Sequence, residues 1–308
     1  MDIQKVFENF VKEEEARNDK MEGVAIADRE KVLLEHHFCT DRARNIYSHT
    51  KSYMSLAVGI AADQGKLSLS DKLSDYFPDK LPESPDEKLL KITLRDLLMM
   101  ASGFDESYLM RHDRRKGVGA PDYVRYMLSR PMKQVPGEKF HYSTGDSILA
   151  GRMVEKAVGM RLGEFLYEYV FTKLGQGWPV WENDLQGHPV GGGGMRMKLT
   201  DMMKIGQLYL ADGKWKGERI VSSNWIRQSS SLQISTHKHS EQDIWNCGYG
   251  YQFWRCPYSE SYRADGAFGQ VTVVLPGQEL VVAVQCNEEG DFSKTVQFLH
   301  ESLFLPLL

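Results

Sequence analysis

A serine and a lysine three residues apart, Ser48 and Lys51, have the types and spacing that could activate a nucleophile. On a helix, positions i and i+3 lie on the same face, so the lysine amine can hydrogen-bond the serine hydroxyl. Burial at the start of a helix would lower the pKa of that amine and suit it to proton transfer. The pair therefore predicts a serine nucleophile that a neighbouring amine activates.

The sequence context decides between two copies of this spacing, because S-x-x-K is frequent by chance. The second copy, Ser235–Lys238, lies in a polar stretch without an apolar helical face. Ser48 instead begins a nearly all-apolar helical pattern that continues to about Gln64 and ends at Gly65. The alternative for Ser48 is a helix N-cap with Lys51 as a surface charge, but so apolar a helix favours burial and therefore catalysis.

Tyr142 is a third candidate, in the segment His141–Asp146 between a Pro136–Gly137 turn and a predicted helix. A phenol on such a loop could reach Ser48 and carry a proton, provided that Lys51 lowers its pKa. From spacing alone, a core tyrosine with a satisfied hydroxyl is the more frequent case.

Composition limits the classes of function. The 308 residues are 42% hydrophobic and 26% charged, which is typical of a folded globular enzyme. The net charge of −4 comes from interspersed charges, so we expect no nucleic-acid partner. The first residues do not resemble a signal peptide and no apolar run is long enough to span a membrane, so we expect a cytoplasmic protein that acts on a small molecule or short peptide. The oligomeric state stays open.

The periodicity predicts an α+β fold. Residues 2–16 have helical spacing, 23–38 and 271–285 read as hairpins, YGYQFW (249–254) has strand character, and an amphipathic helix through Val296 and Leu303 follows. The middle of the chain shows helical periodicity without competing strands. We therefore expect one antiparallel sheet flanked by terminal helices, with an inserted all-helical domain. The sheet domain would comprise residues 1–50 and 240–308 and the helical domain 51–239, with the active site between them.

Four motifs, in this order along the chain, carry a family resemblance: Ser48-x-x-Lys51, ITLRDLLMMASG (92–103), Tyr142-Ser143-Thr144 and RADGAFGQ (263–270). They resemble the serine β-lactamase and penicillin-binding-protein superfamily, especially its class C-like esterases and amide hydrolases. The resemblance implies a β-lactamase/transpeptidase-like fold, with Ser48 as the acylated nucleophile and Lys51 and Tyr142 as the proton-transfer pair.

The same resemblance implies that Ala264–Gly266 is a third motif on a strand at the site. Backbone N–H groups of Ser48 and Ala267 would form the oxyanion hole, and no cofactor is needed. Thr144, Asp265 and Gly266 would contact the substrate.

Two departures from the family pattern shift the expected substrate. Thr144 stands where most members of the family have asparagine. Ala264 stands where many have lysine or histidine, and Asp265 stands where many have threonine or serine. If Asp265 faced the site, it would repel the carboxylate of a β-lactam. We therefore expect hydrolysis of an ester or amide bond. β-Lactamase or D-peptidase activity is one alternative, and a non-catalytic ligand-binding protein on the same fold is another.

Other motifs support no separate site. Gly191–Gly194 lacks the phosphate-loop pattern and reads as a rim loop. His36–His37 and His237–His239 lack the spacing of metal ligands, so no metal is expected. The basic run Arg111–Lys116 reads as a solvated loop. The four cysteines are widely spaced, which indicates neither zinc nor redox chemistry.

Overall fold

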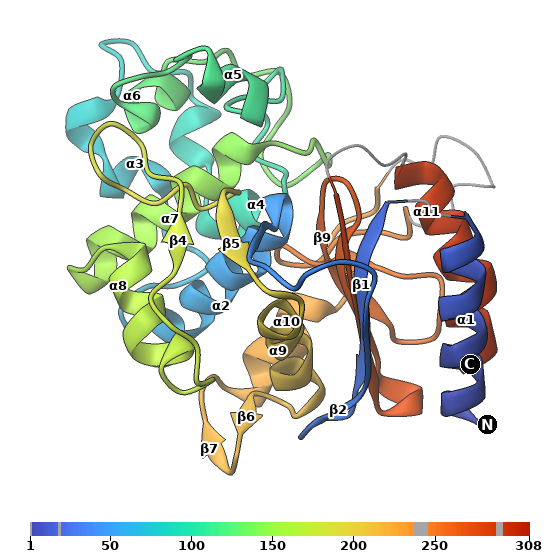
Figure 1. Ribbon diagram of the computed structural model, residues 1–308. Coiled ribbons are helices and arrows are strands. Elements are labelled where there is room, and N and C mark those ends of the chain that lie inside the picture. Colours follow the sequence, from blue (N-terminus) through green and yellow to red (C-terminus); the bar gives the residue numbers. More distant parts are fainter. Residues whose placement is uncertain (1, 18–19, 237–245, 288–291) are drawn as a thin grey trace.

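The computed structural model describes residues 2–17, 20–236, 246–287 and 292–308. Its main sheet has six antiparallel strands in the order β2-β1-β11-β10-β9-β8 (Figure 1). Their bounds are β1 Met21–Ala27, β2 Val32–His37, β8 Trp254–Arg255, β9 Tyr262–Gly266, β10 Gln270–Leu275 and β11 Leu280–Cys286. Both ends of the chain build this sheet, so the predicted α+β fold class and both predicted hairpins are confirmed.

Successive side chains of each strand point to opposite faces of the sheet, so each face contributes to a different hydrophobic core. On one face, Val273 and Val282 pack with Phe10 of α1 (Ile3–Arg17) and Phe298 of α11 (Phe292–Leu299). These two helices, from opposite ends of the chain, lie side by side over that face (Figure 1). On the other face, Ala25, Val281 and Ala283 belong to a core that includes α9 (Leu199–Leu210) and continues into the helical part of the molecule. The sheet and the helices therefore share one continuous core.

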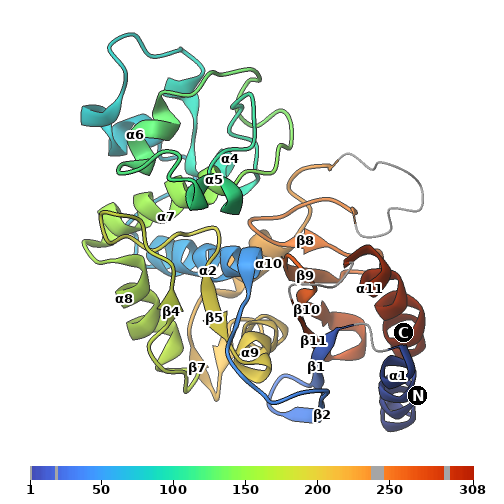
Figure 2. The same cartoon turned by 45° about the horizontal axis from the view of Figure 1, so that its top comes forward.

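The middle of the chain is mainly helical (Figure 2). Its first helix, α2, has every residue buried from Thr50 to Ala61, as its apolar sequence predicts. Besides α9, the described α-helices of this part are α2 Thr50–Asp63, α3 Leu73–Tyr76, α4 Leu94–Leu98, α5 Arg111–Arg115, α6 Tyr123–Leu128, α7 Thr144–Val158, α8 Leu162–Leu166 and α10 Ser223–Ser230. Among the described residues, no helix has the length and apolarity needed to cross a membrane.

The structure corrects two expectations about strands. The middle of the chain does contain short strands: β4 (Val180–Trp181) and β5 (Met195–Met197) pair with β3 (Arg44–Asn45), and β6 (Lys214–Trp215) pairs with β7 (Glu218–Arg219). Strands of two or three residues are too short for an alternating pattern to appear in the sequence. Conversely, YGYQFW contributes only its last residue to a strand, β8, and its Tyr251 and Gln252 carbonyls accept hydrogen bonds from serines of α2 instead.

The contact between α9 and the sheet depends on Gly206. A Cβ atom on Gly206 would lie 2.6 Å from Val281 Cγ1 and 2.7 Å from Thr272 Cγ2. Those atoms belong to β-branched side chains in a dense core, so neither can move away without repacking.

Gly206→Ala should therefore lower the free energy of unfolding by about 1–2 kcal/mol, because overpacking outweighs the better helix propensity of alanine. Gly163→Ala in α8 is the matched control, since its Cβ would meet only Pro189 Cγ at 3.6 Å. Urea unfolding of both variants measures the difference. Equal stability of the two variants would contradict this account of the α9 contact.

Candidate active site

Ser48 lies in a 3₁₀ turn, Tyr47–His49, directly before α2. Tyr47 has a left-handed φ of 48°, which is uncommon for a residue other than glycine. His49 is fully buried, and its Nε2 lies 2.8 Å from Thr272 Oγ1 on β10. Burial lowers the pKa of His49 to about 3, so its ring is neutral. His49 thus ties the turn that carries Ser48 to the central sheet.

Lys51 is 1% exposed and its amine contacts three separate segments. Its Nζ lies 3.2 Å from Ser48 Oγ and 3.3 Å from Thr144 Oγ1, and it donates a hydrogen bond to Gly192 O at 2.6 Å. A neutral amine has two N–H donors and one lone pair. The donors match Gly192 and Thr144, which leaves the lone pair for the Ser48 hydroxyl.

The charges around Lys51 favour this neutral form. Burial lowers its pKa well below the usual value, and the positive charge of Arg114 lowers it further. Asp146 acts in the opposite direction, but burial raises the pKa of this carboxyl itself to about 7. The arrangement therefore favours an uncharged amine beside Ser48.

Tyr142 lies on the other side of this pair. Its ring centroid is 5.0 Å from Lys51 Nζ, and its phenol is near enough to Ser48 for the serine side chain to influence its pKa. Burial raises the pKa of the Tyr142 phenol, contrary to the expectation that Lys51 would lower it. Trp254 stacks on the ring with its centroid 5.8 Å away, and the negative charge of Asp265 adds to the rise in the pKa. Tyr142 is therefore a protonated phenol next to Ser48.

The end of β9 comes very close to the segment before Ser48. A Cβ atom on Gly266 would lie 2.1 Å from Ile46 O, so only glycine fits there. This approach places Ala267 in the wall of the cavity that contains Ser48, whose volume is about 340 Å³. Gly266 therefore has a structural reason to be glycine, whether or not it contacts substrate.

Of the other two residues predicted to contact the substrate, Thr144 lines the cavity and Asp265 does not. Thr144, the first residue of α7, lines the cavity and directs its hydroxyl at Lys51. Asp265 is not in the cavity lining, and its Oδ2 accepts a hydrogen bond from Arg263 Nε at 2.8 Å. Because Arg263 neutralises Asp265, the predicted repulsion of a substrate carboxylate loses its basis.

The basic run was expected to be a solvated loop, and this is wrong for part of it. Residues 111–115 form α5, and four of them line the cavity: Arg111, His112, Arg114 and Arg115. The side chain of Arg114 is only 5% exposed. Its Nε and Nη2 donate to the two carboxylate oxygens of Glu182 at 2.9 and 3.0 Å. Charge density alone could not reveal this, because Glu182 is far away in sequence.

In the glycine segment 191–194, Gly192, Gly193 and Gly194 line the cavity, and Gly192 contributes the carbonyl that Lys51 binds. A Cβ atom on Gly192 would lie 2.7 Å from Thr144 Cγ2 and 3.0 Å from Lys51 Nζ. Trp181 Nε1 holds the segment by donating to Val190 O and Gly193 O, each at 2.9 Å. Glycine is thus required where the backbone approaches the buried amine.

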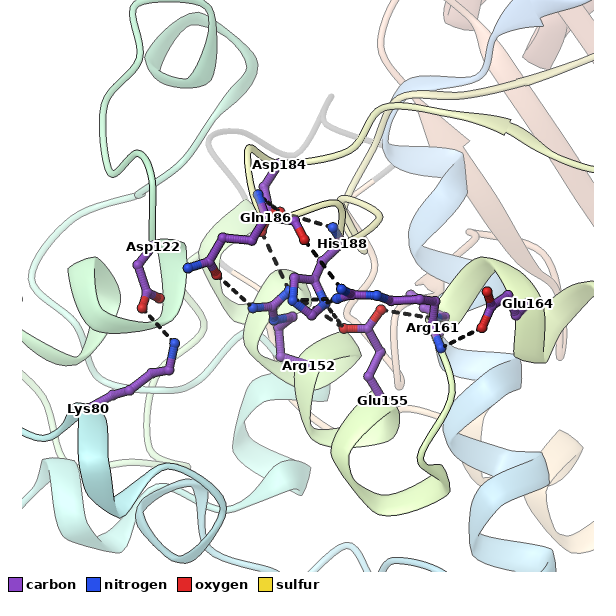
Figure 3. A network of polar contacts seen from close by, with 10 residues as sticks. Lys80, Asp122, Arg152, Glu155, Arg161, Glu164, Asp184, Gln186 and His188 are labelled. Carbon is purple, nitrogen blue, oxygen red and sulfur yellow. Dashed lines mark hydrogen bonds and ion pairs between the residues drawn. The ribbon is translucent and has the colours of Figure 1, made fainter.

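A network of polar contacts anchors the loop that leads into this segment (Figure 3). His188 Nδ1 lies 2.5 Å from Glu155 Oε2, and Arg152 forms ion pairs with Glu155 at 3.6 Å and with Asp184 at 3.5 Å. Glu155 and Arg152 belong to α7, whose first turn carries Thr144. Burial raises the pKa of Glu155 to about 7. The network therefore links α7 to the loop that ends at Gly192.

Sequence reasoning missed a second link, at Gln252. Its Oε1 accepts a hydrogen bond from Ser147 of α7 at 2.7 Å, and its backbone carbonyl accepts one from Ser52 of α2 at 2.8 Å. Its Nε2 donates to Leu98 O at 2.8 Å. Gln252 therefore fixes α2 and α7 relative to each other. The sequence carries no signal for it, since each partner is more than a hundred positions away.

No metal site is visible in the described part of the chain, where no three His, Cys, Asp or Glu side chains form a suitable group. His36 and His37 lie in β2, where they approach Glu15 and Glu35 separately. His237, Lys238 and His239 lie outside the described residues, so only Ser235 and Thr236 of the second S-x-x-K copy are described.

The sheet, the helical part and the serine–lysine–tyrosine cluster define a protein of the β-lactamase/transpeptidase fold. The chain matches the Beta-lactamase family over residues 7–301, and it belongs to that family. The 6-aminohexanoate-dimer hydrolase of Paenarthrobacter ureafaciens is 24% identical over 254 residues, which cover 76% of this chain and 64% of that protein.

Two solved structures show the same fold. EstCE1, described as a hydrolase with promiscuous acyltransferase activity, has a TM-score of 0.76 at 16% identity, with 98% of this chain and 99% of that chain covered. The octameric penicillin-binding protein homologue from Pyrococcus abyssi has a TM-score of 0.74 at 21% identity, with 99% and 78% covered.

The buried carboxyl of Asp146 generates a prediction for stability. Its pKa is about 7 in the folded protein, above the usual value of 3.8. The stabilisation that the protonated form gives is fully present below the unfolded pKa and is lost as the pH rises through about 7. Asp146→Asn mimics the protonated acid and can still accept the hydrogen bond from Ser102.

The Asn variant should therefore gain stability relative to the native protein as the pH rises from about 4 to about 8. Urea unfolding across that range measures the effect, with the exposed Asp79→Asn as control. Parallel pH profiles for Asp146→Asn and the native protein would show that the carboxyl is not perturbed.

Proposed function

We propose that the protein is a serine hydrolase that cleaves an ester or amide bond through an acyl-enzyme on Ser48. The observation that carries the proposal is the 3.2 Å contact between Ser48 Oγ and the buried amine of Lys51. An amine with a lowered pKa can accept the serine proton near neutral pH, and this converts a weak alcohol into a nucleophile.

The chemistry follows from the protonation states. Ser48 Oγ attacks the substrate carbonyl carbon while its proton passes to Lys51. The Tyr142 phenol gives its proton to the departing alcohol or amine and regains one from the Lys51 ammonium. Water then attacks the acyl-enzyme with its proton taken up by the same pair, and the acid leaves as Ser48 is restored.

Backbone N–H groups of Ser48 and Ala267 are our proposed oxyanion hole. Both residues line the same cavity, and Gly266 allows the close approach of their two segments. Backbone donors that are fixed before the reaction stabilise a developing oxyanion without reorganisation. The turn that carries Ser48 is fixed on both sides, because the His49 ring contacts Thr272 Oγ1 of β10 and the Ile46 N–H donates to Met195 O at 2.9 Å, and this supports the role.

The family supports a hydrolase, and the similar proteins named above are described as a 6-aminohexanoate-dimer hydrolase and as a hydrolase with promiscuous acyltransferase activity. Thr144 has a hydroxyl, which contacts Lys51, and it therefore lacks the side-chain amide that the asparagine of the family pattern offers to a β-lactam. This favours esters and simple amides as substrates. A comparison of p-nitrophenyl butyrate, nitrocefin and a D-alanine amide separates esterase, β-lactamase and D-peptidase activity.

A fluorophosphonate probe with peptide mapping tests the nucleophile. Labelling should occur on Ser48, and Ser48→Ala should abolish it and lower ester hydrolysis by about a thousandfold or more. Ser235→Ala is the matched control and should retain both, since Ser235 is an exposed serine of the second S-x-x-K copy. Labelling of another residue, or full activity in Ser48→Ala, would refute the proposal.

The pH dependence of hydrolysis tests the role of the amine. Arg114 lowers the pKa of Lys51, so Arg114→Gln should raise that pKa and move the acid limb of kcat/KM to higher pH. In this variant the Glu182 carboxylate would lose its Arg114 partner, and its negative charge would also raise the pKa of Lys51. Lys116→Gln, which removes a charge outside the cavity lining, should leave the limb in place. An acid limb that does not move in Arg114→Gln would argue against Lys51 as the base.

A further inference from the structure

We infer that the acyl part of the substrate is an apolar group, alkyl or aryl, and that Phe268 selects this group by packing against it beside Ser48. The inference rests on the proposed function and adds the substrate class. It starts from the place of Phe268 in the fold, where a large apolar side chain occupies a strained backbone position.

Phe268 lies in the middle of the connection between β9 and β10. Gly266 pairs with Gln270 across the two strands, so residues 267–269 form this connection. The φ of Phe268 is 62°, in the left-handed region, where the Cβ atom of a bulky residue crowds the backbone. Glycine or asparagine is the usual residue at such a position in a tight turn. The backbone conformation therefore disfavours a phenylalanine.

The packing of the fold does not explain this phenylalanine. Its side chain is only partly buried, and within the described part of the chain it belongs to neither hydrophobic core. Its ring meets the ring of Tyr47 edge to face, with the two centroids 5.2 Å apart. A residue that keeps a strained conformation without a packing reason indicates a functional role.

Phe268 lines the cavity that contains the nucleophile. Ala267, Ser48 and Met110 line the same cavity, and Met110 adds a second apolar side chain to it. The contact with Tyr47, the residue before Ser48, keeps the Phe268 ring near the serine. A carbonyl oxygen held by the N–H groups of Ser48 and Ala267, as proposed above, would therefore have one substituent of its carbon beside this ring.

The acyl group is the substituent that meets the ring. In the proposed reaction the leaving group receives its proton from Tyr142, so it faces that phenol. Tyr142 is not among the described residues that line the cavity, and its ring packs with Trp254 and Tyr249 instead. The acyl group extends from the other side of the carbonyl carbon, into the cavity that Phe268 lines. Burial of apolar surface against the ring then favours alkyl and aryl acyl groups over polar ones.

Two pairs of neutral esters test the inference. The acyl chains of p-nitrophenyl hexanoate and p-nitrophenyl 4-methoxybutanoate are equally long, but an ether oxygen replaces one methylene in the second. The acetates of 4-butylphenol and 4-(2-methoxyethyl)phenol place the same difference in the leaving group. The native enzyme should prefer the hexanoate by about threefold to tenfold in kcat/KM and should hydrolyse the two acetates about equally. An absent preference for the hexanoate, or a larger preference within the acetate pair, would overturn the inference.

Phe268→Ala should reduce the acyl preference to less than about twofold, and Phe268→Leu, which keeps an apolar side chain, should retain most of it. A disturbance of the neighbouring Ala267 N–H would affect both esters of a pair equally, so the ratio reports the acyl contact. Phe38→Ala is the matched control and should keep the native ratio, since Phe38 is also partly buried but is not a described lining residue of the cavity. A native ratio in Phe268→Ala, or an equal loss in Phe38→Ala, would contradict the role of Phe268.

Urea unfolding separates this role from a structural one. Glycine suits the left-handed backbone at position 268, so Phe268→Gly should not lower the urea midpoint, although the contact with Tyr47 is lost. The same variant should lose the acyl preference. A lower midpoint would show that the fold needs the ring for packing, and this would remove the basis of the inference.

A binding measurement separates the inference from the proposed function. The Ser48→Ala variant is titrated calorimetrically with two unreactive amides, hexananilide and 4-methoxy-N-phenylbutanamide. Tighter binding of hexananilide that disappears when Phe268→Gly is added supports the apolar acyl site even if no ester is turned over. Hydrolysis that depends on Ser48, with no acyl preference in turnover or binding, would leave the hydrolase intact and refute the acyl site.

Discussion

The buried amine of Lys51 is the contact on which the site depends, because it joins three segments that the sequence keeps far apart. Ser48 precedes α2, Thr144 begins α7 and Gly192 belongs to the loop after β4, yet each has a polar atom within 3.3 Å of Nζ. A charged ammonium would lose its hydration in this position at a large cost. A neutral amine satisfies all three contacts, so the fold itself favours the protonation state that the proposed chemistry requires.

Contacts elsewhere in the structure fix the positions of these three segments relative to one another. His49 ties the serine turn to β10, Gln252 joins α2 to α7, and Trp181 and the network around Glu155 hold the glycine segment. Gly266 adds the close approach of β9. The site therefore lies where the sheet and the helices share one core, and small displacements in either part would change the distances around Lys51.

The sequence predicted the features that depend on local periodicity. The Ser48 and Lys51 spacing, the apolar helix after them and both terminal hairpins are local, and the structure has them in place. Features that depend on tertiary partners were not predictable. The Gly192 carbonyl, the Arg114–Glu182 pair and Gln252 act across long sequence separations. The pKa of Tyr142 shifts opposite to expectation, because burial of the phenol, which only the tertiary structure reveals, raises it.

The most direct test of the account is an NMR titration of protein labelled with ¹⁵N at the lysine side-chain nitrogens. The Lys51 signal is identified by its absence in Lys51→Ala. The account predicts that this signal titrates well below the ordinary lysine value of about 10.4, so that Lys51 is largely a neutral amine in the resting enzyme. A Lys51 signal that titrates near the ordinary value would contradict the account, since Ser48 would then face an ammonium that has no lone pair to accept its proton.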